Sequence, residues 1–104
     1  MKTRTISEDP QRGGKPAAAG VVSVIMPAYN SAHSLSCAIE SALSQEGAQT
    51  EIIVVNDGST DGTAAAARSF GQRIVYLEQS NQGQGAARNL GLAAATGEYI
   101  AFLD

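Results

Sequence analysis

A run of four β-branched apolar residues that ends in a polar loop is the feature that most constrains the fold of this chain. The stretch from Ile52 to Thr63 has the sequence IIVVNDGSTDGT. Four consecutive Ile and Val residues without polar alternation indicate a strand that is covered on both faces, as in a parallel sheet flanked by helices. Such sheets bind ligands at the carboxyl ends of their strands, so the loop that begins at Asp57 is a candidate site.

Strand and helix patterns alternate along the rest of the chain. Four apolar runs predict strands, at residues 21–26, 51–56, 74–78 and 99–103. Three stretches with apolar residues at helical spacing predict helices, at 32–45, 64–70 and from Gly83 or Gly85 to a stop at Gly97. The order βαβαβαβ predicts a Rossmann-like, doubly wound parallel α/β sheet. We expect its last strand to form an exposed edge.

Composition and charge divide the chain in two. The 104 residues suffice for one small domain. Residues 1–20 are polar, contain Gly and Pro, and predict a flexible leader before a domain at 21–104. From Val21 onward three arginines face eight carboxylates, which disfavours nucleic acid and anionic lipid as partners. We expect no membrane contact from this segment.

Cysteine usage and the lack of long apolar runs bear on location. A single cysteine, Cys37, excludes an internal disulfide and fits a reducing compartment, so we expect a cytoplasmic protein. No apolar run has the length of a membrane span, and the first residues lack the apolar core of a signal peptide. Membrane association would then come from sequence beyond Asp104.

Five sequence blocks resemble the nucleotide-sugar half of the family 2 glycosyltransferases, which have the GT-A fold. The blocks are VSVIMPAYN at 22–30, IESALSQ at 39–45, EIIVVNDGSTDGT at 51–63, NQGQGAARNLGL at 81–92 and GEYIAFLD at 97–104. Their order and spacing match across residues 21–104. In relatives the last strand continues into an Asp-x-Asp motif, whereas this chain stops at the first aspartate. The resemblance therefore implies a truncated, incomplete GT-A domain.

The resemblance also implies a chemistry. Members of this family transfer a sugar from a nucleotide-diphosphate donor to an acceptor hydroxyl, with inversion at the anomeric carbon. A divalent Mg²⁺ or Mn²⁺ ion stabilises the departing diphosphate. We expect a UDP-sugar as donor, and the acceptor is undefined. The catalytic base lies beyond Asp104, so we expect the chain alone to be inactive.

Three residues at the tip of the first strand and one at the tip of the second are carried over as candidate substrate-binding residues. Asp57 resembles the residue that accepts a hydrogen bond from the imide N–H of uracil, although a turn-making role is its alternative. Tyr29 would lie against the base or ribose, or would only pack in the corner. Pro27 and Ala28 precede it, and Pro27 shapes the corner. Asp61 is interpreted as a cap of the following helix.

The third strand and the last residue add further candidates. Gly83 would let the backbone approach a ligand at the start of a helix, which favours an anion, or would serve close helix packing. Arg88 would contact base or phosphate, or instead hold Asp57 and Asp104 through ion pairs. Asp104 would lie by the ribose or bind the metal.

Other classes of protein fit less well. The Asp57 loop imitates an EF-hand, but its twelfth position is Arg68 where a bidentate Glu is needed. A dinucleotide-binding domain needs a glycine-rich turn after the first strand, and this chain has PAYN there. His33 has no partner for a triad or metal pair and is expected to face solvent. An inactive truncated product, or a weak nucleotide-binding module, is the alternative to an enzyme.

Overall fold

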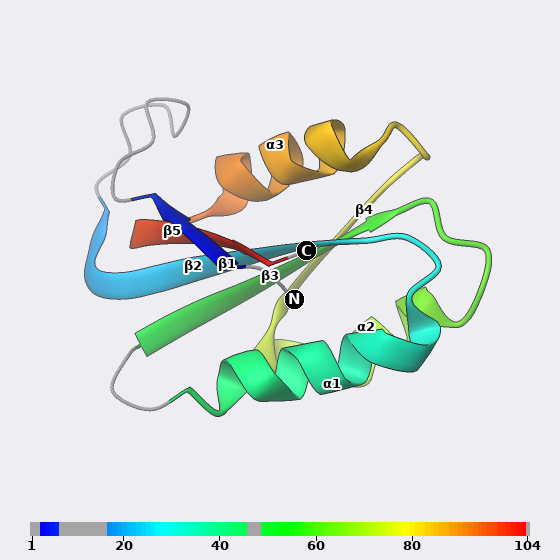
Figure 1. The fold of residues 1–104 in the computed structure, drawn as a ribbon, viewed down its shortest axis with the longest axis horizontal. Coiled ribbons are helices and arrows are strands. Elements are labelled where there is room, and N and C mark those ends of the chain that lie inside the picture. The colour runs from blue at the N-terminus through cyan, green and yellow to red at the C-terminus, as the bar shows by residue number, and fades with distance from the viewer. Residues whose placement is uncertain (1–2, 7–16, 46–48, 104) are drawn as a thin grey trace.

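The structure, a computed structural model, describes residues 3–6, 17–45 and 49–103 and confirms the α/β fold (Figure 1). The strands are β1 (Thr3–Ile6), β2 (Ala18–Ala28), β3 (Gln49–Asp57), β4 (Val75–Gln79) and β5 (Gly97–Leu103). The helices are α1 (Ala32–Leu43), α2 (Thr63–Arg68) and α3 (Gln84–Ala94), with a 3-10 helix, η2, at Gly71–Arg73. The four predicted strands and three predicted helices are all present.

The strands form one sheet in the order β1-β5-β2-β3-β4. β2 is parallel to both β3 and β5, and β4 is parallel to β3, as predicted. β1 runs antiparallel to β5 and covers its outer side. The expectation of an exposed edge at 99–103 is therefore wrong, because the first residues of the chain occupy that edge.

Part of the predicted leader is also regular structure. Thr3–Ile6 forms β1, and β2 begins at Ala18 rather than at Val21. Residues 7–16 of the leader lie outside the described residues. The additional pairing is backbone hydrogen bonding at a sheet edge, which an irregular polar sequence gives little reason to predict.

The sheet is covered on both faces (Figure 1). In β3 the side chains of Ile52, Ile53, Val54 and Val55 are all at most 2% exposed, which confirms a strand buried on both sides. One core cluster joins Ile52 and Val54 to α1 and α2, and the other joins Ile53 and Val55 to α3. The predicted inner face of α1 is confirmed at Leu35, Ala38, Ile39 and Ala42.

Helix α3 lies closer to the sheet than its apolar pattern predicts. Its buried residues are Ala87, Gly91 and Leu92, whereas Ala86, Leu90 and Ala94 are only partly buried. A Cβ at Gly91 would lie 2.5 Å from Cγ2 of Ile25, so a glycine is what allows this approach. Spacing of large apolar residues cannot detect a contact made through the absence of a side chain.

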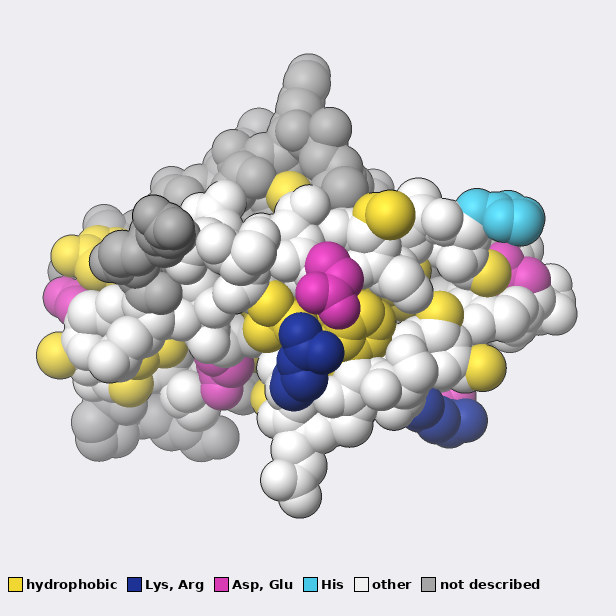
Figure 2. Space-filling view, turned by 90° about the horizontal axis from the view of Figure 1, so that it is seen from below, with side chains coloured by type: hydrophobic (Ala, Val, Ile, Leu, Met, Phe, Trp, Pro, Cys, Tyr) yellow, Lys and Arg dark blue, Asp and Glu magenta, His cyan; other side chains and the backbone are white. Residues whose placement is uncertain are grey.

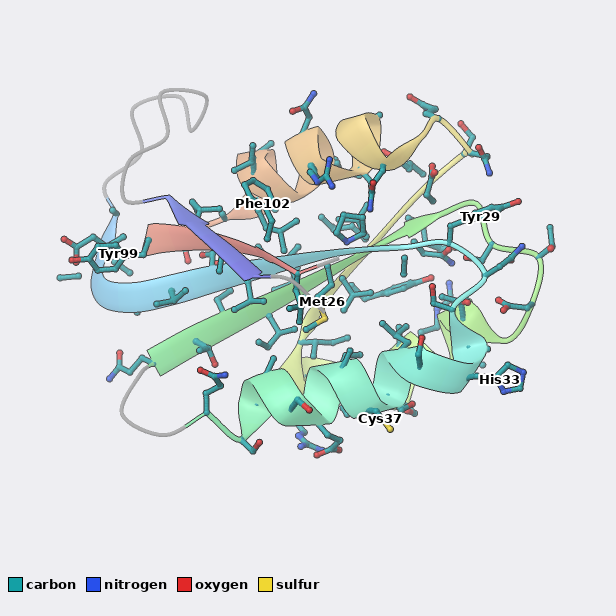
Figure 3. The ribbon with its side chains drawn as sticks, in the orientation of Figure 1. Met26, Tyr29, His33, Cys37, Tyr99 and Phe102 are labelled. Carbon is teal, nitrogen blue, oxygen red and sulfur yellow. The ribbon has the colours of Figure 1, made fainter. Side chains whose placement is uncertain are left out.

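Charged side chains on the helix α1 and α2 side are engaged in ion pairs. In Figure 2, basic side chains lie next to acidic ones on the face seen from below. Arg68 forms an ion pair with Glu78, and Arg73 forms one with Glu40. His33 and Cys37 are exposed on α1 (Figure 3). Among residues 3–6, 17–45 and 49–103, no helix has the length and apolarity that crossing a bilayer requires.

Candidate functional site

A pocket of about 470 Å³ opens at the carboxyl ends of the parallel strands. It lies between the loops that follow β2, β3 and β4, which is where a doubly wound sheet binds ligands. The residues that line it are Pro27, Ala28, Tyr29, Ser31, Asp57, Asn81, Gly83 and Gln84. The pocket thus brings together five predicted site residues: Pro27, Ala28, Tyr29, Asp57 and Gly83.

Asp57 holds the end of β4 and the β4–α3 loop through three hydrogen bonds. Its Oδ1 accepts from Nε2 of Gln79 at 2.9 Å and from the N–H of Gln82 at 2.8 Å. Its Oδ2 accepts from the N–H of Gly83 at 3.0 Å. Gly83 has φ +98°, a conformation that favours glycine. The carboxylate is 5% exposed and borders the pocket, so it combines a structural role with access to a ligand.

The same donors keep this carboxylate ionised. The amide of Gln79, followed by the N–H of Gln82, lowers the pKa of Asp57 below its ordinary value of 3.8, against the opposing effect of desolvation. Asp57 is therefore a negatively charged, acceptor-only group at neutral pH. Such a group is suited to a ligand that offers an N–H or O–H donor.

The GSTDG loop is clamped to the loop after β2. The N–H of Asn30 donates to Oγ of Ser59 at 2.9 Å, and Oδ1 of Asn30 accepts from the N–H of Thr60 at 2.9 Å. Asn30 has φ +48°, which asparagine tolerates better than most residues. Beside it, the N–H of Ser31 donates to Oγ1 of Thr63 at 2.8 Å. The two loops that frame the pocket are therefore held in one arrangement.

Asp61 accepts hydrogen bonds from the first N–H group of two helices, whose N-cap residues are Ser31 and Gly62. Its Oδ1 accepts from the N–H of Thr63, the first residue of α2, at 2.9 Å. Its Oδ2 accepts from the N–H of Ala32, the first residue of α1, at 3.3 Å. Hydrogen bonding from Thr63 lowers the pKa of Asp61, which fits a carboxylate at helix N-termini.

Tyr29 projects from the loop after β2 beside the pocket and is 49% exposed (Figure 3). An exposed aromatic ring at a pocket wall is available to stack on a planar ligand. Arg88 is half-buried on α3 and is not among the residues that line the pocket. Asp104 lies outside the described residues.

The described part of the chain does not by itself provide a metal centre. Among these residues, no group of three or more His, Cys, Asp or Glu side chains could hold a metal ion. Three acceptor positions of Asp57 are occupied by N–H donors, so this carboxylate is poorly suited to coordinate a metal ion. A divalent cation with oxygen ligands does not fit these residues alone.

Two residues that shape the site were not predicted. Gln79 carries the amide that contacts Asp57, and the parallel register places the two residues side by side. Gly58 has φ +70°, and a Cβ there would lie 2.6 Å from the backbone nitrogen of Asn81. Gly58 therefore lets the β3–α2 loop approach the β4–α3 loop. Alignment of the strand ends in parallel register would have identified Gln79.

Comparison with known proteins relates the site to a family. Residues 23–104 match the family described as Glycosyl transferase family 2. An uncharacterized glycosyltransferase of Rickettsia typhi is 47% identical over 84 residues, which cover 81% of this chain and 26% of that protein. This chain thus spans about a quarter of the length of that relative.

Solved structures with the same fold carry nucleotide sugars. TarS of S. aureus in complex with UDP-GlcNAc has a TM-score of 0.66 and 29% identity, covering 80% of this chain and 26% of TarS. A mannosyltransferase from Pyrobaculum calidifontis in complex with GDP-Man and Mn²⁺ has a TM-score of 0.71 and 29% identity, covering 88% of this chain and 28% of that enzyme. With the strand order, the pocket and the family match in agreement, this chain belongs to glycosyl transferase family 2 and has the Rossmann-like α/β architecture of the GT-A fold.

Proposed function

We propose that residues 21–104 bind the nucleotide of a nucleotide-diphosphate sugar, with a UDP-sugar as the donor. The observation that carries this proposal is the ionised carboxylate of Asp57 at the wall of a pocket that also has Tyr29. A carboxylate accepts the imide N–H of uracil, while the tyrosine ring can stack on the base or ribose. The solved relatives hold UDP-GlcNAc in one case and GDP-Man in another, so the fold alone does not determine the base.

The activity that we propose for the protein is transfer of the sugar to an acceptor hydroxyl with inversion at the anomeric carbon. Asp57, Tyr29 and Gly83 hold and orient the nucleotide in this proposal, and none of them takes part in bond making. Arg88 is proposed to support the site from α3. A cytoplasmic location belongs to the same proposal and rests on the single cysteine.

We also propose that a Mg²⁺ or Mn²⁺ ion takes part, with Asp104 among its ligands. Support comes from the Mn²⁺ of the Pyrobaculum calidifontis complex and from the resemblance of GEYIAFLD to the strand that leads to an Asp-x-Asp motif. When bound, such an ion supplies Lewis-acid stabilisation to a departing diphosphate. The residues described here do not complete its coordination, so we expect the 104-residue chain alone to transfer no sugar.

A titration of the ¹⁵N-labelled chain with UDP tests the nucleotide site. We expect the largest amide shifts at Tyr29, Asp57 and Gly83, and little change at Thr96, which follows α3 at the amino ends of the strands. The absence of shifts, or shifts centred on Thr96, would contradict the proposal. A radiolabelled-sugar transfer assay on the same chain should show no turnover, and turnover would contradict the proposal that the catalytic base and the other metal ligands lie outside these 104 residues.

A further inference from the structure

Neither the sequence motifs nor the family match assigns a role to Gln79, whose side chain lies next to the site. It is the last residue of β4, half-buried, and lies opposite Asp57 in the parallel register of β3 and β4. Its Nε2 donates to Oδ1 of Asp57 at 2.9 Å. Because an ionised carboxylate only accepts hydrogen bonds, the amide nitrogen rather than the amide oxygen must face it. Gln79 itself does not line the pocket.

The hydrogen bonds to Asp57 are distributed unevenly over its two carboxylate oxygens. An ionised carboxylate has about four acceptor positions, two on each oxygen. On Oδ1 both are taken, by Gln79 and by the N–H of Gln82. On Oδ2 the N–H of Gly83 takes one. Asp57 therefore has about one open acceptor position for a ligand in the pocket, and that position is on Oδ2.

A single open acceptor position distinguishes between nucleobases. Uracil presents one imide N–H between two carbonyl groups, so one acceptor satisfies its donor. Guanine presents two adjacent N–H donors, on N1 and N2, and needs one acceptor position on each carboxylate oxygen. Cytosine and adenine present an unprotonated ring nitrogen, which a carboxylate repels. An unsatisfied donor in a desolvated site is unfavourable, so the arrangement suits uracil.

We propose that Gln79 is a positioning residue that determines the base preference of this chain, because it fills Oδ1 of Asp57 and leaves a single acceptor for uracil. The proposal rests on the proposed nucleotide site and deepens it. Without the Gln79 donor, Oδ1 is no longer held toward β4, so the carboxylate can turn and present both oxygens to guanine in the pocket. The Gln79 amide thus weakens guanine binding indirectly, through its hydrogen bond to Asp57.

The test compares the dissociation constants of UDP and GDP, measured by calorimetry on the 104-residue chain. We expect the wild type to bind GDP at least about tenfold more weakly than UDP. Gln79→Met keeps the size of the side chain and removes the donor, and it should lower the ratio of the GDP to the UDP constant by about tenfold. Gln72→Met is the matched control, because Gln72 is exposed in η2 before β4 and should leave the ratio unchanged.

Gln79→Leu provides a second variant that removes the donated hydrogen bond with a side chain of different shape. If the role of Gln79 were purely structural, its loss would weaken the binding of UDP and of GDP by the same factor. An unchanged ratio of the GDP to the UDP dissociation constant in both variants would therefore overturn the inference. Wild-type chain that binds GDP as tightly as UDP would overturn it without any mutant. Binding of neither nucleotide by a folded chain would instead contradict the proposed function itself.

Discussion

Strand β3 carries a hydrogen-bonded carboxylate toward each of its ends, and the two act differently. At the carboxyl end, Asp57 accepts from Gln79, Gln82 and Gly83. Near the amino end, Glu51 accepts from Oγ of Ser23 at 2.8 Å and from the N–H and Oγ1 of Thr96, each at 2.9 Å. Each carboxylate thus joins β3 by hydrogen bonds to a segment that is distant in the sequence.

The surroundings of the two carboxylates differ. Asp57 borders a pocket of about 470 Å³, whereas the Glu51 network surrounds Gly97, where a Cβ would lie 2.6 Å from the carbonyl oxygen of Val21. The N–H of Gly97 also donates to Oγ of the buried Ser23 at 2.8 Å. The comparison teaches that anchoring a loop with a carboxylate does not make a site. A site also needs an open acceptor position that faces space for a ligand.

The largest expected effect is a loss of stability near the amino end of β3, where Gly97 packs beside the Glu51 network. Gly97→Ala should lower the free energy of unfolding by about 3 kcal/mol, because the added methyl group meets the backbone of Val21 and Ser23 at 2.6 and 2.8 Å. Urea denaturation measures the loss. Gly85→Ala is the matched control, since nothing lies within 4 Å of a Cβ at that helical position, and it should be neutral or slightly stabilising. Equal stability of the two variants would contradict close packing at Gly97.

A pair of exposed tyrosines sharpens the comparison between the two ends. Tyr29 lies beside the pocket, and Tyr99 lies at the far end of the sheet in β5 (Figure 3). Tyr29→Ala should weaken UDP binding by about fivefold through loss of stacking on the nucleotide. Tyr99→Ala should leave UDP affinity unchanged in the same calorimetric titration. Equal effects of the two substitutions would mean that the ring of Tyr29 does not contact the nucleotide.

The smallest expected effect is a dependence of stability on pH. The pKa of Asp57 lies below 3.8 in the folded chain, so its ionised form stabilises the fold above that pH. This contribution is lost as the pH falls through the lowered folded-state pKa, because the unfolded chain then binds the proton more readily. The urea midpoint of the wild type should therefore fall more steeply below about pH 4 than that of Asp57→Ala. Parallel pH profiles would show that the hydrogen bonds do not favour the ionised form.

Strong local patterns made most of the fold predictable. The run at 52–55, the apolar face of α1 and the order of elements were sufficient for a doubly wound sheet. The strand tips predicted Asp57 and Tyr29 as site residues, and both line the pocket. β1 was missed because the four residues TRTI are too short to show a period and gain their place by pairing with β5. Gly91 was missed because its contact with Ile25 depends on a missing side chain.

The roles of single residues at the site were less predictable. The sequence places Gln79 at the end of β4, but the contact of its amide with Asp57 is fixed only by the register between β3 and β4. The clamp from Asn30 to Ser59 and Thr60 likewise joins residues about thirty positions apart. Such contacts arise from the tertiary fold, so a motif can locate a site without specifying how its groups are held.

Affinity for UDP in Asp57→Ala and Glu51→Ala, measured by calorimetry, tests the central claim most directly. We expect Asp57→Ala to weaken UDP binding at least about tenfold, because the base loses a charged acceptor. Glu51→Ala should leave the affinity within about twofold, although it should lower the free energy of unfolding by about 2 kcal/mol through unpaired donors at Ser23 and Thr96. Equal losses of affinity in the two variants, or none in Asp57→Ala, would contradict the claim that only the carboxylate at the pocket serves the ligand.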